Sequence, residues 1–176
     1  RYTDQFGRVG SNIQNVGNSS TYGLSLAGDI GLVGLADTVF DATNRAKIGE
    51  FRLYGNVTFL DAEFTSGPVD GKTPQYAPNS LVKFGTIYDY HSLAKIALMG
   101  TVVSDHWGDD GDSDNRFIPD YMVWDLTGEI NVYKDVVSIV GGINNLFDEK
   151  YFSRVRSSGI DPALPRNAYA GLSVRF

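Results

Sequence analysis

The sequence predicts an all-β protein that forms an antiparallel transmembrane β-barrel. Apolar and polar residues alternate in at least five segments of similar spacing, which is the period of a β-strand. Aromatic residues reach 12% of the chain, and there is no cysteine. Long polar connections alternate with short turns. An outer-membrane barrel combines these features, because lipid contacts one face of each strand and water contacts the other.

Seven strands are expected in chain order, with a partial eighth near residues 1–8. They cover residues 21–30, 51–59, 81–90, 94–103, 122–133, 136–147 and 168–176. The last of these alternates without a break. Its apolar positions are Ala168, Ala170, Leu172, Val174 and Phe176, and its polar positions include Tyr169, Ser173 and Arg175. The pattern predicts that the apolar set faces lipid.

The fifth expected strand, residues 122–133, separates polar and apolar side chains most clearly. Asp125, Thr127, Glu129 and Asn131 lie on one side, and Met122, Leu126 and Ile130 lie on the other. Asp125 and Glu129 could act as a general acid and base. The continuous polar stripe and the lack of a third catalytic group favour the inner wall of a water-filled barrel instead.

The connections differ in length in a regular way. Residues 90–92 and 133–135 are short turns, whereas residues 66–79, 105–119 and 149–166 are long and polar. Outer-membrane barrels have short periplasmic turns and long extracellular loops, so the three long loops are expected outside. Residues 31–49 break this rule, since they form a long connection where a short turn is expected.

Composition excludes several classes of protein. The net charge is −6 without a basic stripe, which excludes nucleic acid as a partner. The longest apolar run, residues 94–103, is far shorter than the ~20 residues of a membrane-spanning helix. No nucleophile elbow, phosphate-binding loop or zinc-protease motif is present, so neither an enzyme nor a cofactor is expected. Residues 1–176 are expected to be one domain, and the start at Arg1 suggests a fragment without its signal peptide.

The loop at residues 105–115 holds five aspartates. Asp110, Asp112 and Asp114 have the spacing of a calcium loop, but the glycine and glutamate that complete an EF-hand are missing. A solvated acidic loop is the main interpretation, and weak calcium binding is the alternative.

The last third of the chain carries a specific motif. It contains Gly142, Ile143, Asn144, Asn145, Leu146, Phe147 and Asp148, then Lys150, Tyr151 and Phe152, then Pro165, Arg166 and Asn167, and it closes on Val174, Arg175 and Phe176. This stretch resembles the C-terminal end of TonB-dependent outer-membrane receptors, especially receptors for ferric citrate or siderophores. Shorter similarities extend the resemblance over nearly the whole chain.

The resemblance implies a fold and a function. Such receptors are barrels of about 22 strands with a plugged lumen, of which this chain would supply about the last eight. It implies uptake of a ferric chelate across the outer membrane of a Gram-negative-type bacterium. The implied partners are outer-membrane lipid and lipopolysaccharide, the barrel-assembly machinery, and TonB, which would bind an N-terminal segment absent from this chain.

The motif and the aromatic residues near it have candidate roles. The segment 144–148 could bind ligand, but Asn and Asp side chains commonly bond nearby backbone where a strand ends, so a structural role is preferred. Tyr151 and Phe152, or alternatively Trp124, are expected in the outer aromatic girdle.

Arg154 and Arg156 are the candidate ligand contacts in the last long loop. Citrate-type iron carriers are anionic, and arginine binds carboxylates in a bidentate way. An ordinary solvated loop is the alternative for this pair.

The sequence is also compatible with two other functions. Eight strands could close as a small self-contained outer-membrane barrel with a structural or adhesion role. A soluble lipocalin-type barrel also has eight strands, but it would place apolar side chains inside.

The terminal residue generates the first prediction. Before the barrel closes, the last strand has unpaired backbone groups that another strand can pair with. In the resembled family, the barrel-assembly machinery reads a terminal aromatic residue on such a strand. Deleting Phe176 from the full-length protein should reduce heat-modifiable barrel in the outer membrane and leave synthesis unchanged. Normal assembly of the deletion variant would contradict a signal role and leave Phe176 as an ordinary interface aromatic.

Overall fold

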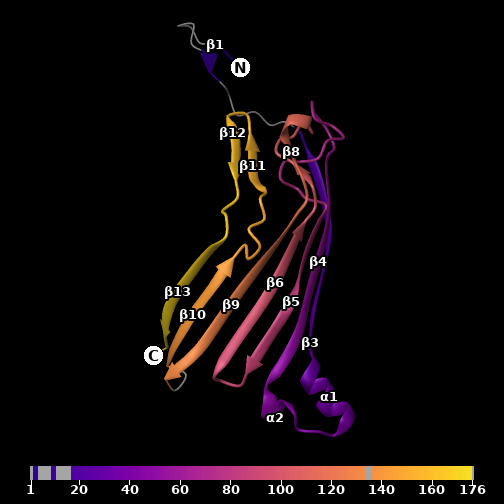
Figure 1. The fold of residues 1–176 in the computed structure, drawn as a ribbon. Coiled ribbons are helices and arrows are strands. Elements are labelled where there is room, and N and C mark those ends of the chain that lie inside the picture. The colour runs from indigo at the N-terminus through magenta and orange to yellow at the C-terminus, as the bar shows by residue number, and fades with distance from the viewer. Residues whose placement is uncertain (1, 4–8, 11–16, 134–135, 176) are drawn as a thin grey trace.

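A computed structural model describes residues 2–3, 9–10, 17–133 and 136–175. Seven antiparallel strands form one sheet in which each strand pairs with its neighbours in chain order (Figure 1). They are β3 (Ser19–Gly31), β4 (Glu50–Phe64), β5 (Ser80–Tyr90), β6 (Ala94–Val103), β9 (Tyr121–Tyr133), β10 (Val137–Asn144) and β13 (Asn167–Val174). All seven strands predicted from the alternation are therefore confirmed.

The sheet is open within the part of the chain that the structure describes. The strands β3 and β13 are its two edges and lie on opposite sides of it (Figure 1). The predicted barrel closure is therefore not formed by these strands alone. The expected eighth strand falls largely outside the described residues. Of that region, β1 (Tyr2–Thr3) and β2 (Val9–Gly10) pair with each other and not with the main sheet.

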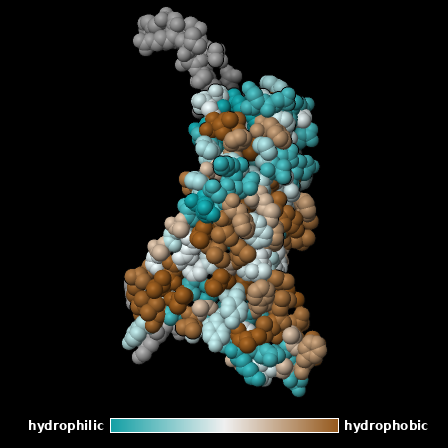
Figure 2. Space-filling model, viewed as in Figure 1, coloured by the Kyte–Doolittle hydropathy of each residue, from teal (hydrophilic) through white to brown (hydrophobic). Residues whose placement is uncertain are grey.

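The two faces of the sheet differ as the alternation predicts. Exposed large apolar residues gather on one face, which we call the apolar face, and its members include Tyr22, Leu24, Leu26, Ile30, Leu53, Phe59, Ile96, Met122, Ile130, Ile139, Leu172 and Val174. Figure 2 shows apolar residues over the strands and hydrophilic residues at the upper end. A soluble barrel would bury its apolar face, so this arrangement argues against the lipocalin-type alternative.

The opposite face, which we call the polar face, carries the predicted charged stripe. Glu129 on β9 lies there and accepts a hydrogen bond from Arg175 at 3.0 Å. The hydroxyl of Ser138 on β10 donates to Asn131 at 2.5 Å on the same face. Every buried strand residue of the main sheet other than glycine, among those described, also belongs to this face; these residues are Glu50, Ala62, Phe64, Val103, Val123 and Ser138.

The three long connections share one end of the sheet, as predicted. The first, between β4 and β5, has no regular strand of its own. The second contains β7 (His106–Trp107), the 3₁₀ helix η1 (Asp114–Arg116) and β8 (Phe117–Ile118). The third contains the hairpin of β11 (Phe152–Arg156) and β12 (Gly159–Pro162) (Figure 1). We call this the loop end and the opposite side the turn end.

The long connection at the turn end is helical. It contains α1 (Leu32–Phe40) and α2 (Arg45–Ile48). Sequence reasoning missed both helices, although Leu32, Leu35, Ala36 and Val39 have helical spacing. Neither helix in the described residues is long and apolar enough to cross a membrane. The residue Phe176, which carries the assembly-signal prediction, lies outside the described residues.

The position of Leu126 yields a prediction about the apolar face. Leu126 lies on this face in register with Leu98 and Ile143. In the full-length protein, Leu126→Arg should reduce the free energy of folding into lipid vesicles by ~2–4 kcal/mol, as expected for a charge near the bilayer midplane. Thr127→Arg is the matched control, because Thr127 lies on the polar face beside a cavity of about 310 Å³. Equal effects of the two variants, measured by denaturant titration in vesicles, would contradict the assignment of faces.

Candidate functional site

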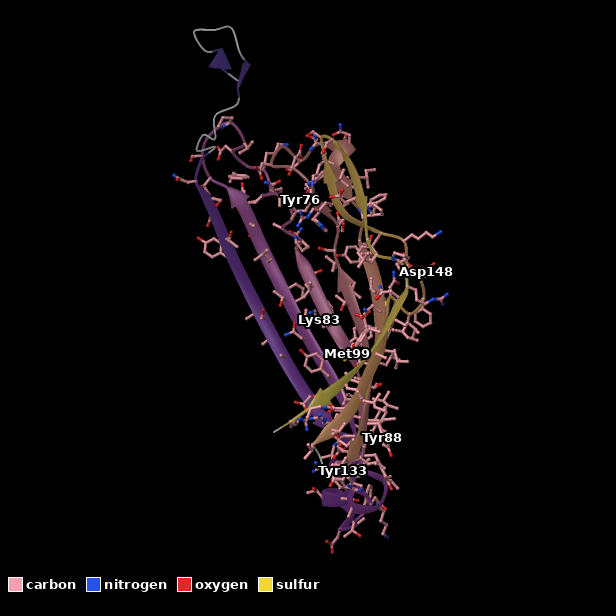
Figure 3. The ribbon with its side chains drawn as sticks, turned by 90° about the vertical axis from the view of Figure 1, so that its left-hand side faces the viewer. Tyr76, Lys83, Tyr88, Met99, Tyr133 and Asp148 are labelled. Atoms are coloured by element: carbon pink, nitrogen blue, oxygen red, sulfur yellow. The ribbon has the colours of Figure 1, made fainter. Side chains whose placement is uncertain are left out.

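A cavity with a volume of about 670 Å³ lies at the loop end. Its floor is formed by Leu81, Val103 and Tyr121, which are register partners on the polar face of β5, β6 and β9. Its walls come from all three long loops and include Gln75, Tyr76, His106, Arg116, Arg154 and Arg156. Figure 3 shows Tyr76 at this end of the molecule, above Lys83 and Met99 on the strands. Because the strands deliver the loops side by side, residues far apart in sequence meet here.

The cavity brings the two predicted arginines together with a third. Arg154 and Arg156 lie on β11, and Arg116 comes from η1. Arg156 is paired with Asp161 at 3.0 Å, across an exposed hairpin. Within the described part of the chain, Arg154 forms no ion pair or side-chain hydrogen bond. Its guanidinium therefore remains available to an anionic ligand.

Tyr76 joins the three loops. Its amide donates to the carbonyl of Trp107 at 2.7 Å, and its hydroxyl donates to the carbonyl of Val155 at 3.3 Å. Its ring meets His106 edge-on at 6.4 Å. Gly108 permits the same close approach, since a Cβ there would lie 2.5 Å from the Val155 carbonyl oxygen. These contacts hold the cavity walls against one another.

The acidic loop makes contacts within the loop end. Asp110 accepts a hydrogen bond from the amide of Gln75 at 2.9 Å, and Asp112 lies 3.9 Å from the ammonium of Lys72. Asp114 begins η1. Among the residues the structure describes, no three His, Cys, Asp or Glu side chains are grouped to hold a metal ion. Asp110, Asp112 and Asp114 therefore do not form such a group in the described structure, and weak calcium binding by them stays a prediction.

Within the acidic loop, the surroundings of Asp109 lower the pKa of its carboxyl group. Burial acts to raise the pKa of Asp109, but hydrogen bonds from the hydroxyl and amide of Ser113 and the nearby Arg116 outweigh it, so the pKa lies below its ordinary value. A carboxylate with a lowered pKa stabilises the folded state above its unfolded pKa, and this contribution is lost as the pH falls through the folded pKa. The loop therefore keeps this stabilising charge at neutral and mildly acidic pH.

Asn145 anchors the last loop, as the structural interpretation of the segment 144–148 predicts. Its backbone amide donates a hydrogen bond to the Asp125 carboxylate at 2.9 Å, and its side chain bonds the backbone of Glu149 and Leu164. Asp148 accepts a hydrogen bond from the amide of Arg166 at 2.8 Å. Asn145 is 4% exposed and has a φ of 52°, a region that asparagine tolerates. The motif fixes both ends of the loop that carries Arg154.

The aromatic residues expected in the girdle divide between the faces. Trp124 lies on the apolar face and meets Phe84 edge-on at 5.2 Å. Tyr151 instead stacks on Tyr121 at 4.1 Å, which places it beside the polar face and not in an outer girdle. Phe152 begins β11 and is exposed.

Sequence reasoning found Arg154 and Arg156 but missed the other cavity residues. Tyr121 could have been found, because it has the same parity as Asp125 at the loop end of a predicted strand. No local pattern marks Tyr76, His106 or Arg116, which the fold brings together from separate loops.

Comparison with known proteins gives a family. The model for "TonB dependent receptor-like, beta-barrel" matches residues 1–146. No curated protein matches the chain. Among solved structures, the ferric citrate transporter FecA in its unliganded form aligns with a TM-score of 0.73 and 20% identity, covering 90% of this chain and 24% of that one.

Two further structures have similar folds. The siderophore receptor PiuA from Acinetobacter baumannii has a TM-score of 0.66 and 21% identity, covering 90% of this chain and 22% of its own. The ferric yersiniabactin uptake receptor FyuA from Yersinia pestis has a TM-score of 0.64 and 16% identity, covering 90% and 23%. The chain thus spans about a quarter of the length of these structures.

The anchoring role of Asn145 can be tested by substitution. Asn145→Ala removes the side-chain bonds of a buried amide and strains the backbone, so it should destabilise the last loop by ~2–4 kcal/mol. Asn145→Gly keeps the backbone relaxed and isolates the lost hydrogen bonds. The control is Asn144→Ala, which loses one exposed bond to Asn167. Hydrogen exchange of residues 149–164 in the full-length protein measures the effect, and equal protection in Asn145→Ala and the control would contradict it.

Proposed function

This chain belongs to the TonB-dependent receptor β-barrel family, and from that premise we propose that it forms part of an outer-membrane receptor for a ferric chelate. The receptor binds the chelate at the loop end and imports it with energy relayed from the inner membrane. It is not an enzyme. Two of the similar structures are, by their descriptions, a ferric citrate transporter and a siderophore receptor, which supports this class of ligand.

The observation that carries the proposal is the guanidinium of Arg154, which has no ion-pair or hydrogen-bond partner among the described residues and shares a cavity with Arg116 and Arg156. Carboxylate and other oxygen-rich chelates are anionic and match the planar donor fork of arginine. A cavity of about 670 Å³ falls within the usual range of small-molecule sites, roughly 300–1,000 Å³. Tyr76 and Tyr121 add aromatic surface for the apolar parts of the ligand. Ferric citrate or a siderophore of similar charge is the proposed substrate.

The apolar face supports an outer-membrane location. On β4 it runs from Phe51 to Phe59 and then changes to Asp61 and Glu63. The eight steps between these two residues, at about 3.3 Å each, span about 26 Å along the strand, which matches the ~25 Å apolar band of outer-membrane barrels. Aromatic residues bound this band at both ends. Lipid and, on the loop side, lipopolysaccharide are the proposed partners of this face.

The loop end is proposed to face the outside of the cell, and the turn end the periplasm. The open sheet favours a segment of a larger plugged barrel of about 22 strands over a self-contained barrel of eight. Strands from the rest of the protein would pair with the edges β3 and β13. A plug domain would fill the lumen. TonB would bind outside this segment, and the barrel-assembly machinery would bind the terminal strand.

The test of the proposal is the affinity of the full-length receptor for ferric citrate. Arg154→Ala removes a charge-assisted contact of ~1.5–3 kcal/mol, so Kd should rise about 10-fold or more. The measurement is isothermal titration of the detergent-solubilised receptor. Binding of a neutral ferric chelate should change much less.

Arg166→Ala is the matched control, since Arg166 lies in the same loop but does not line the cavity. Arg154→Lys keeps the charge and should retain part of the affinity. Unchanged binding of every anionic ferric chelate by Arg154→Ala would contradict the assignment of this cavity as the ligand site.

A further inference from the structure

The helical connection at the turn end has an inverted arrangement. A surface helix usually buries its apolar side and exposes its polar side. The helix α1 departs from this pattern, because its large apolar side chains are the exposed ones and its less exposed residues are Val33, Gly34, Ala36 and Asp37. The buried carboxylate of Glu50 accepts hydrogen bonds from the amides of Val33 and Gly34, at 3.0 and 3.2 Å, at the start of the helix. Glycine permits this approach at position 34, where a Cβ would lie 2.9 Å from the carboxylate.

Two carboxylates fix the connection as a unit. Glu50 also pairs with Arg45 of α2 at 3.1 Å. Asp37 of α1 accepts hydrogen bonds from the amides of Arg45 and Asn44, at 2.7 and 2.9 Å. These backbone hydrogen bonds, led by that of Arg45, hold the pKa of Asp37 below its ordinary value. The helices are therefore bound to each other and to β4 through polar contacts.

The apolar side of the connection is left uncovered within the described structure. The large side chains on it are between 38% and 78% exposed; they are Leu32, Leu35, Val39 and Phe40 of α1 and Ile48 of α2. Those of α1 come directly after β3, whose last apolar-face residue is Ile30. Figure 2 shows apolar residues continuing from the strands to this lower end.

Aromatic residues mark the level at which the connection leaves the sheet. Phe51, Tyr88 and Tyr90 lie on the apolar face at the turn end, and the two tyrosine rings stack at 6.4 Å. The hydroxyl of Tyr88 donates to the carbonyl of Ile48 at 2.6 Å, which ties the end of α2 to this aromatic row (Figure 3). Aromatic rows of this kind sit at the headgroup level of outer-membrane barrels.

We propose that residues 32–48 form an interfacial membrane anchor that rests on the phospholipid headgroup layer of the periplasmic leaflet, an inference that rests on the proposed function. The occupant of its apolar side is lipid, because that side continues the apolar face and starts at the aromatic row. Lys47 is exposed beside Ile48 and matches the anionic headgroups of such a layer. Leu35 and Val39 enter the acyl-chain boundary, while Thr38 stays in water.

Spin labelling of the full-length receptor in phospholipid vesicles tests the anchor. This chain contains no cysteine, so single nitroxides can be placed in it at Val39→Cys and at Thr38→Cys, the matched control on the same helix. The ratio of collision rates with oxygen, which partitions into lipid, and with a water-soluble nickel chelate should be several-fold higher at residue 39 than at residue 38. A label at Leu26→Cys reports the apolar face of the strands.

Each outcome decides a separate question. A lipid signal at residues 26 and 39 supports the anchor. A lipid signal at residue 26 with a water signal at residue 39 overturns the anchor and leaves the membrane barrel intact. A residue 39 label inaccessible to both reagents shows that protein, such as another strand or a second copy, covers the helix and also overturns the anchor. A water signal at residue 26 would instead overturn the proposed function itself.

Discussion

The antiparallel backbone ladder from β3 to β13 is the constraint on which the rest of the structure depends. Because each strand is paired in an unbroken register apart from one irregularity beside Ser138, side-chain parity carries across all seven strands. The same parity that exposes Leu53 and Phe59 exposes Ile96 and Ile130. On β4 this parity continues past Phe59, so Asp61 faces the same side as the apolar residues while Ala62 and Phe64 become buried under the loops. A single ladder thus produces an apolar band and, beyond it, a small core.

The ladder also explains why the loop end can form a site. Strand pairing brings the three long loops side by side, but their fixed shape comes from polar contacts such as those of Tyr76 and Asn145. Two residues in these loops, Ile118 and Val155, are almost fully buried. The loops therefore have a small core of their own. This core presents Arg154 at a fixed position, and a fixed position reduces the ordering cost of binding an anion.

The strands could be predicted from the sequence because the alternation of apolar and polar residues lies within each strand itself. Alternation specified all seven strands to within a few residues, and the motif at 144–148 specified the anchor of the last loop. Only some of the residues that line the cavity could be predicted from the sequence. Arg154 and Arg156 are near each other in sequence, whereas Arg116 joins them through pairing between distant loops, which no local pattern encodes. Tyr151 was assigned to the wrong side because its partner Tyr121 lies on β9, a strand distant from it in sequence. The helices were missed since the residue that caps α1, Glu50, follows the helix in sequence instead of preceding it.

Glu50 connects β4 to the helical connection at the turn end. It occupies a polar-face position of β4 and would be an ordinary inward-facing charge of a barrel wall. At the first residue of the strand, however, it is beyond the paired register of β3 and can reach the amides of Val33 and Gly34. Its negative charge suits the positive end of a helix, and Arg45 balances it. This polar cluster lies against the start and inner side of α1, and the large apolar residues Leu32, Leu35, Val39 and Phe40 are left exposed. The alternation that orients the strands therefore also determines which side of the helical connection is offered to its surroundings.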